Sequence, residues 1–215
     1  MNKSEIEFGS FLSYSVRGTS NKAEESKSTM RNLKRDRVLN SGILTSENFA
    51  RAIKNDLNKY PFEDYFNSDA VLVPTPRSSL PIKGMLWVPQ RITTALINNG
   101  LGKSSEACLE RIVAVSRSSG QRNGALRATP SQHYESMKVN ELLFEPKEIV
   151  MVDDVVTRGS TFLGGVNRLA EAFPKAKIRA FAVMRSIYAP NDFSEIVDPC
   201  VGKITVSLDV PQRDP

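Results

Sequence analysis

Residues 148–161 read EIVMVDDVVTRGST, and this stretch decides the fold class of the chain. Residues 149–152 form a short, continuous apolar run rich in β-branched side chains, which is typical of a strand buried on both faces of a parallel sheet. Asp153 and Asp154 follow at the carboxyl end of this predicted strand. Ligands of open α/β sheets bind beyond that end, so we expect both carboxylates to face a ligand.

The segment after the carboxylates has the composition of an anion-binding loop. Hydroxyl groups, one position without Cβ and a run of backbone N–H groups come from Thr157, Arg158, Gly159, Ser160 and Thr161. Apolar residues then recur at helical spacing as far as Pro174, which predicts a helix of about three turns capped by Ser160 or Thr161. The N-terminus of this helix would favour a phosphate. The alternative is that the two acids simply end a strand and cap a helix.

This pattern resembles the signature of the type I phosphoribosyltransferases, which is an apolar strand, two acids, two mostly apolar residues and a Thr/Ser/Gly-rich loop. The resemblance implies that Asp153 and Asp154 are the catalytic residues. They would hold the ribose hydroxyls of 5-phosphoribosyl-1-pyrophosphate (PRPP) and meet Mg²⁺ indirectly, through PRPP. It implies equally that residues 157–161 bind the 5′-phosphate. Many members carry Thr at the position of Arg158. The amidophosphoribosyltransferases resemble this chain in carrying Arg there. Asn2 follows Met1 where that subgroup has its nucleophilic Cys, so a glutamine-hydrolysing domain is not expected.

A P-loop nucleotidase also has an acidic residue after an apolar strand, and it needs a partner motif. The nearest candidate is Gly102-Lys103-Ser104. The first glycine of G-x-x-x-x-G-K-[ST] would fall at Ile97. This alternative is therefore excluded.

A second loop is predicted on the same side of the sheet. Residues 69–76, DAVLVPTP, read as a buried strand, and in the resembling family the loop after the first core strand contacts pyrophosphate. The resemblance thus implies pyrophosphate contacts from Thr75, Arg77, Ser78 and Ser79, although Arg77 suits a surface turn equally well. The V-P-x-P form resembles the ComF-type, or competence-associated, branch, whose usual Arg-Gly-Phe-Asn segment is absent between residues 80 and 90.

Residues 109–115 are predicted to form the second core strand, and residues 116–134 a polar loop. In the resembling family a mobile loop in this position closes over the substrate. Arg117, Arg122 and Arg127 are therefore candidates to reach pyrophosphate, with an ordinary surface loop as the alternative. His133 is the one histidine of the chain, and in a polar loop we expect it at the surface rather than as a general base.

The fold class predicted from these segments is α/β, with an open, mainly parallel sheet flanked by helices. We expect a single domain over residues 1–215, with a basic, mobile extension over residues 1–40 and a core over residues 61–210. Residues 17–37 are rich in Ser, Lys and Arg and suggest an irregular segment. Further elements are predicted as helices over residues 49–57 and 89–98, strands over 177–185 and 203–210, the last at an edge, and a loose tail.

Composition sets few limits on function. The formal charge of +5 suits a phosphate-rich substrate as readily as nucleic acid. Cys108 and Cys200 belong to no metal-binding or disulfide pattern. The absence of a long apolar run and of a signal peptide predicts a cytoplasmic protein without membrane contact.

The predicted function is a Mg²⁺-dependent transferase that displaces pyrophosphate from PRPP with a nitrogen nucleophile. The acceptor is unidentified, with Phe181, Ile187 and Tyr188 as candidates to contact a base, and Arg185 either selects the acceptor or is solvated. The alternative is a non-enzymatic PRPP sensor, or an accessory protein of the competence type bound to DNA or RNA. A homodimer is compatible with both.

Overall fold

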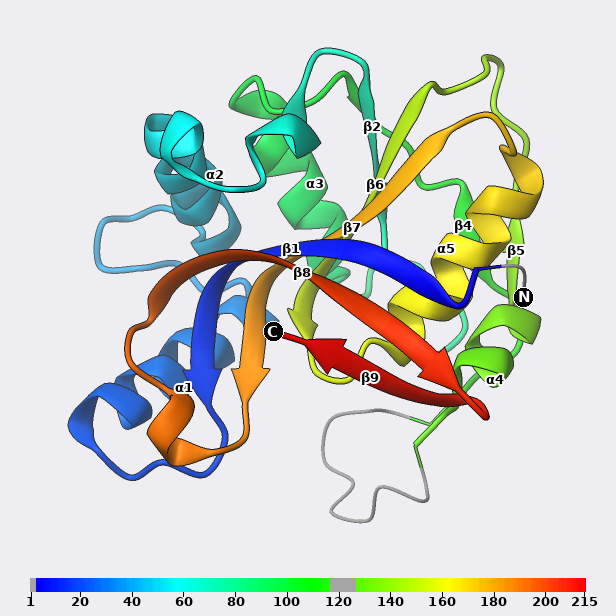
Figure 1. The fold of residues 1–215 in the computed structure, drawn as a ribbon. Helices are drawn as coiled ribbons and strands as arrows, with labels where there is room; N and C mark the ends of the chain where they lie inside the picture. Colours follow the sequence, from blue (N-terminus) through cyan, green and yellow to red (C-terminus); the bar gives the residue numbers. More distant parts are fainter. Residues whose placement is uncertain (1–2, 117–126) are drawn as a thin grey trace.

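The computed structural model describes residues 3–116 and 127–215, and it has a seven-stranded sheet with the order β3-β2-β6-β7-β1-β8-β9 (Figure 1). The strands from β3 to β1 in this order run parallel, and β8 and β9 are antiparallel to their neighbours. An open, mainly parallel α/β sheet is thereby confirmed. The strands are β1 Glu5–Ser15, β2 Ala70–Pro74, β3 Ser104–Ser105, β6 Glu148–Val156, β7 Lys177–Ile187, β8 Val197–Ser207 and β9 Val210–Asp214.

Strand β6 lies between two other strands, and its apolar run is covered on both faces of the sheet. It pairs with β2 at Leu72↔Val150 and with β7 at Val152↔Phe181. Residues 149–152 are fully buried, as the sequence predicts. Asp153 and Asp154 belong to the last residues of the strand, at the edge where the arrowheads of β1, β6 and β7 lie in Figure 1.

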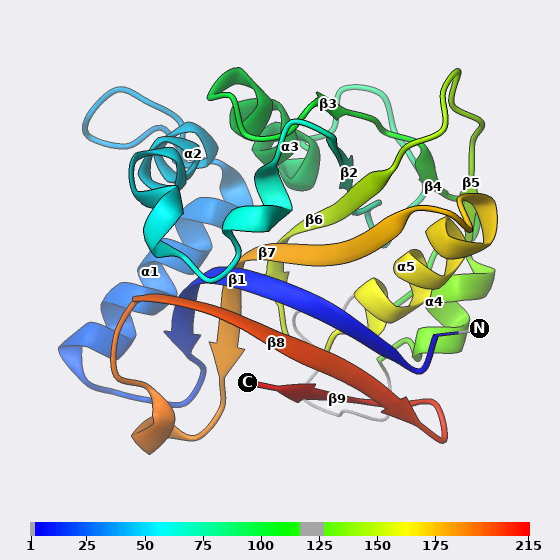
Figure 2. The ribbon, with the colours of Figure 1, turned by 45° about the horizontal axis from the view of Figure 1, so that its top comes forward.

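Helices cover both faces of the sheet, as Figures 1 and 2 show. One face carries α1 Asn21–Arg35, α2 Thr45–Asp56 and α3 Val88–Asn98. The other carries α4 Pro130–Glu135, α5 Ser160–Ala172 and a short hairpin of β4 Leu109–Arg111 with β5 Met137–Val139. Three 3₁₀ turns complete the described elements: η1 Leu57–Lys59, η2 Glu63–Phe66 and η4 Pro190–Asp192.

Each face has its own apolar core. On the α1–α3 side, Phe181 lies against Phe62 and Phe66, with ring centroids 5.1 and 5.0 Å apart. On the α5 side, Phe162 and Val166 pack in a cluster with Met151. Burial of one such ring contributes about 2 kcal/mol. Phe181 is fully buried in this core, so the expectation that it contacts a base is wrong.

The N-terminal segment belongs to the core, contrary to the predicted mobile extension over residues 1–40. Strand β1 lies between β7 and β8, and α1 replaces the irregular segment expected over residues 17–37. The sequence was misleading because α1 buries few apolar side chains: its buried residues are Ala23, Leu33 and the polar Ser26.

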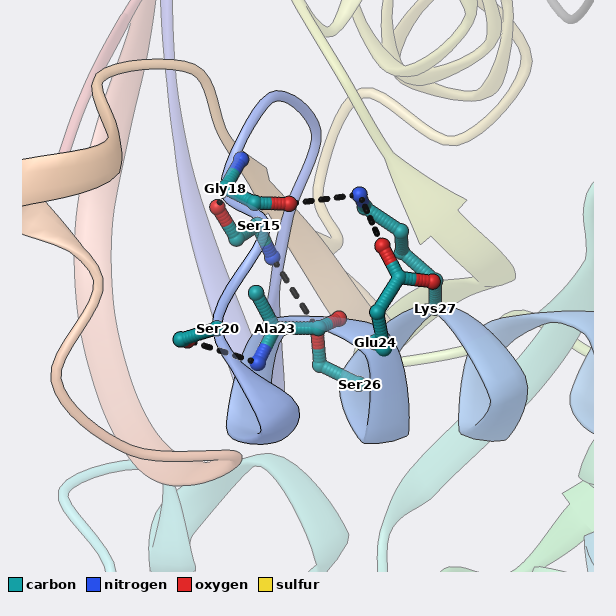
Figure 3. A network of polar contacts seen from close by, with 7 residues as sticks. All are labelled: Ser15, Gly18, Ser20, Ala23, Glu24, Ser26 and Lys27. Carbon is teal, nitrogen blue, oxygen red and sulfur yellow. Dashed lines mark hydrogen bonds and ion pairs between the residues drawn. The ribbon is translucent and has the colours of Figure 1, made fainter.

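Polar contacts attach α1 to the carboxyl end of β1 (Figure 3). The Ser15 backbone N–H donates to the Ser26 hydroxyl, at 3.2 Å. The Lys27 Nζ donates to the Gly18 carbonyl at 2.6 Å and to Glu24 at 2.8 Å. These contacts hold α1 against the sheet, where an apolar stripe would usually hold a helix. They fix the start of the helix, and its last turn reaches the ligand side of the sheet.

Two further strand predictions need correction. The strand expected over residues 109–115 in the core is the short β4, which pairs with β5 outside the main sheet. The predicted edge strand over 203–210 is β8, and the tail expected to be loose forms β9 beside it. Leu208 and Asp209 turn the chain with φ angles of 49° and 59°, the left-handed conformation of a tight hairpin turn.

No helix within residues 3–116 and 127–215 is long and apolar enough to cross a membrane.

Candidate functional site

A cavity of about 710 Å³ opens at the carboxyl ends of the parallel strands. Its walls come from the ends of β1, β2 and β6, the N-terminus of α5, and α1 and α4. The structure brings most of the predicted site residues together here, namely Thr75, Arg77, Ser78, Arg127, Asp153, Asp154, Thr157, Arg158, Gly159, Ser160 and Thr161. Ser79 lines an adjoining cavity of about 240 Å³ instead. Arg117, Arg122 and the rest of the predicted mobile loop up to residue 126 lie outside the described residues.

The two carboxylates differ in their partners. Asp154 Oδ2 is 3.1 Å from Lys34 Nζ, which α1 delivers from the opposite end of the sequence. Burial, and next the charge of Asp154, raise the pKa of Asp153 well above its usual range, although Lys34 opposes this shift. For Lys34, burial favours loss of the proton, but Asp154 and Asp153 outweigh it and raise the pKa of the ammonium. The site therefore favours a proton on Asp153, while Lys34 contacts Asp154.

The loop before α5 leaves backbone donors available at the cavity. Gly159 is the N-cap of α5, with a φ of 91° and no side-chain cap hydrogen bond. The helix thus begins at Ser160, and the cap is Gly159 rather than the predicted Ser160 or Thr161. A Cβ at Gly159 would lie 2.6 Å from Ile204 Cδ1, so only glycine fits this approach of the loop to β8. Uncapped N–H groups at a helix N-terminus form an anion-binding site.

The loop after β2 is held by its backbone. The Thr75 N–H donates to the Val152 carbonyl at 2.8 Å, and the Trp87 indole donates to the Thr75 carbonyl at 2.7 Å. The Thr75 Oγ1 is buried and has no hydrogen-bond partner among the described residues. A buried hydroxyl without a partner is costly, and Thr75 is one of the residues that line the cavity.

Two buried residues that sequence reasoning did not assign to the site lie between these loops. Arg111 at the end of β4 and His133 in α4 are each 2 % exposed and line the cavity. The expectation that His133 is a surface residue is wrong, because the segment 130–135 is a helix packed on α5. Burial lowers the pKa of Arg111 to about 10, with Asp153 acting in the opposite direction. Burial and the charge of Arg111 lower the pKa of His133 to about 4.

Some predicted contacts with the acceptor lie elsewhere. Arg185 is buried and its Nη2 is 2.5 Å from Asp198 Oδ2, so it is neither solvated nor among the residues that line the cavity. Tyr188 does line the cavity, together with Tyr14 from β1. Tyr14 and Lys34 were missed because their elements were expected outside the core. The basic cluster around Lys34 and the arginine inside the apolar run 109–115 were the available signals.

The cavity suits a magnesium ion that arrives with a ligand. No group of three His, Cys, Asp or Glu side chains that could hold a metal occurs in the described parts of the chain. Asp153 and Asp154 supply carboxylate oxygens, which Mg²⁺ prefers, and Mg²⁺ usually completes its shell with water and substrate phosphates. These residues therefore fit an ion shared with a phosphorylated substrate.

Comparisons with known proteins give a weak structural match and no match in sequence. A hypoxanthine phosphoribosyltransferase from Staphylococcus aureus matches with 13 % sequence identity and a TM-score of 0.32, over 66 % of this chain and 73 % of that one. No family model and no curated protein matches the sequence. The structure itself shows a mixed α/β architecture with a mostly parallel sheet flanked by helices.

Proposed function

We propose that the protein is a phosphoribosyltransferase that displaces pyrophosphate from PRPP with a nitrogen nucleophile. One observation carries this proposal. The acidic pair, the loop at the N-terminus of α5 and the loop after β2 converge on one cavity at the carboxyl end of the sheet. A ligand with hydroxyls between two phosphate groups has the matching chemistry. PRPP is such a ligand.

Each part of the cavity has a role in this proposal. Asp153 and Asp154 accept hydrogen bonds from the ribose hydroxyls, and the α5 N-terminus binds the 5′-phosphate. Arg77 and Thr75, which line the cavity, would contact the pyrophosphate. Binding energy from the remote phosphate orients the reacting carbon.

Charge separation during the reaction also fits these walls. As the anomeric bond breaks, positive charge grows on the ribose and negative charge on the pyrophosphate. The two carboxylates stabilise the first, and arginines stabilise the second through preorganised electrostatics. Mg²⁺, when bound with the substrate, would supply further neutralisation of the leaving group. An acceptor that is already nucleophilic needs no protein base, and neutral, buried His133 is not required as one.

Tyr14, Tyr188 and Met30 line the cavity and offer apolar surface to a flat ring. A base is therefore the class of acceptor that we propose to screen first, by release of pyrophosphate.

The test is calorimetric titration of PRPP with Mg²⁺ into the wild type and the Asp153→Asn/Asp154→Asn variant. We expect binding to weaken by about 100-fold in the variant, because two charge-assisted contacts are lost. An Asp56→Asn/Asp69→Asn variant replaces two carboxyl groups outside the cavity and should bind like the wild type.

Absence of PRPP binding to the folded wild type would contradict the proposal. A strongly salt-dependent affinity for single-stranded DNA in that case would favour the nucleic-acid alternative. PRPP binding without turnover on any nitrogen acceptor would favour a sensor.

A further inference from the structure

A chain of buried polar groups connects the loop after β2 with the loop before α5. Arg111 Nε donates to the Arg77 carbonyl at 3.0 Å, and its Nη1 donates to the Ser136 hydroxyl at 2.5 Å. Its Nη2 is 3.4 Å from His133 Nδ1, and His133 Nε2 is 3.4 Å from Thr161 Oγ1. Both phosphate-facing loops are thus joined through two side chains from other elements.

The chemistry of Arg111 and His133 fixes which group donates and which accepts in each hydrogen bond of this series. A guanidinium has donors and no acceptor, so His133 Nδ1 must present its lone pair to Arg111. A neutral imidazole then carries its proton on Nε2 and donates it to Thr161 Oγ1. Since Thr161 Oγ1 receives this hydrogen, its own O–H is free to point at a ligand in the cavity.

Close packing holds the histidine in place. A Cβ at Gly164 in α5 would lie 2.6 Å from His133 Cβ, so α4 and α5 approach each other where the imidazole leaves its helix. A capping box of Thr129 and Gln132 fixes the start of α4. The ring consequently has little freedom to leave Thr161.

We propose that Arg111 and His133 form a hydrogen-bond relay that makes the Thr161 hydroxyl a donor to the 5′-phosphate. The assignment of that phosphate rests on the proposed function. Within it, His133 is a positioning residue that acts through Thr161, and Arg111 fixes the tautomer of His133.

The direction of the relay can be read without any ligand. His133 is the one histidine of the chain. In a protein prepared without a histidine tag, ¹⁵N NMR therefore gives one set of imidazole signals. We expect the Nε2–H tautomer at pH 7, and we expect it to persist at pH 5.5 because the pKa of His133 is lowered to about 4. An Nδ1–H tautomer, or a ring protonated at pH 5.5, would overturn the proposal.

Two conservative variants separate the halves of the relay. In His133→Gln the amide can reach the position of Nε2, so it can still donate to Thr161. In His133→Asn the amide oxygen can replace Nδ1, and the donor to Thr161 is lost. Titrations with ribose 5-phosphate should show about tenfold weaker binding for His133→Asn and less than about threefold for His133→Gln. Equal weakening in both would contradict the relay.

Tyr134→Phe is the matched control, since Tyr134 lies in the same helix and its hydroxyl contacts Glu171 outside the cavity. Its ribose 5-phosphate affinity should equal that of the wild type, and thermal unfolding should show that all variants fold. Failure of the wild type to bind ribose 5-phosphate would count against the proposed function. The tautomer spectrum would then still decide whether the relay exists.

Discussion

Two walls of the cavity have different origins. The contiguous wall, residues 153–161, comes from a single stretch that leaves β6 and enters α5. The assembled wall, Lys34, Arg111 and His133, comes from α1, β4 and α4. The contiguous wall supplies carboxylates, hydroxyls and backbone donors. The assembled wall supplies a half-buried cation, Lys34, a buried cation, Arg111, and the imidazole of His133. These groups set the charge and orientation of the groups in the contiguous wall.

The difference teaches how function is divided between sequence and fold. A contiguous wall can be recognised as a pattern because one backbone turn places all its groups. An assembled wall depends on three segments meeting, and each of its members looks ordinary in its own stretch of sequence. Mutations in the two walls should therefore have different effects on stability and ligand binding.

The largest effect is expected at Gly159, where the contiguous wall depends on its backbone. Gly159→Ala places a Cβ against Ile204 at a φ of 91°. We expect a loss of about 3 kcal/mol in the free energy of unfolding and no measurable ribose 5-phosphate binding. Chemical denaturation and calorimetry measure the two effects.

Gly84→Ala is the control for this prediction. Gly84 has a similar φ of 81°, but a Cβ there meets nothing within 4 Å. The loss should be about 1 kcal/mol, from backbone strain alone. Equal losses at both glycines would show that the contact with Ile204 is unimportant.

A smaller effect is expected when the assembled wall loses its cation. Lys34→Met leaves Asp154 unpaired beside Asp153, and we expect a loss of about 1.5 kcal/mol in the free energy of unfolding at pH 8. The loss should be smaller at pH 5, because a protonated Asp153 no longer repels Asp154. Since the pKa of Asp153 is raised, this protonation occurs at a higher pH than for an ordinary aspartate. Urea unfolding at the two pH values measures it.

Lys22→Met provides the comparison for an exposed ion pair. Lys22 is 2.7 Å from Glu195, but the two side chains are 46 % and 64 % exposed. Its loss should be below about 0.5 kcal/mol at either pH. A pH-independent loss for Lys34→Met would contradict the coupling between Lys34 and the protonation of Asp153.

The smallest effect is a gain in stability from removing a carboxylate of the contiguous wall. The pKa of Asp153 is raised in the folded protein, so its ionised form is disfavoured there and folding is weakened as pH rises through that pKa. Asp153→Asn should therefore raise the free energy of unfolding by about 1 kcal/mol at pH 8. The gain should shrink on acidification. A loss of stability at pH 8 would show that Asp153 is favourably paired.

Much of the sheet could be predicted because the apolar runs and helical periodicities in the sequence indicate directly which residues are buried. The apolar runs of β2 and β6 and the periodicity of α3 and α5 correspond to elements of the structure. Helix α1 was missed because polar contacts such as Ser15–Ser26 replace an apolar stripe. The tail was missed because β9 is half exposed and exists through its pairing with β8.

The sequence by itself determined the strand that ends in Asp153 and Asp154 and the glycine-containing loop before α5, since neighbouring residues along one backbone share their geometry. Only the tertiary structure decided that Lys34 pairs with Asp154, that His133 is buried, and that Arg111 reaches the Arg77 carbonyl. Contacts between distant segments depend on how helices and strands pack. Burial, which shifts the pKa values of Asp153, Arg111 and His133, exists only after that packing.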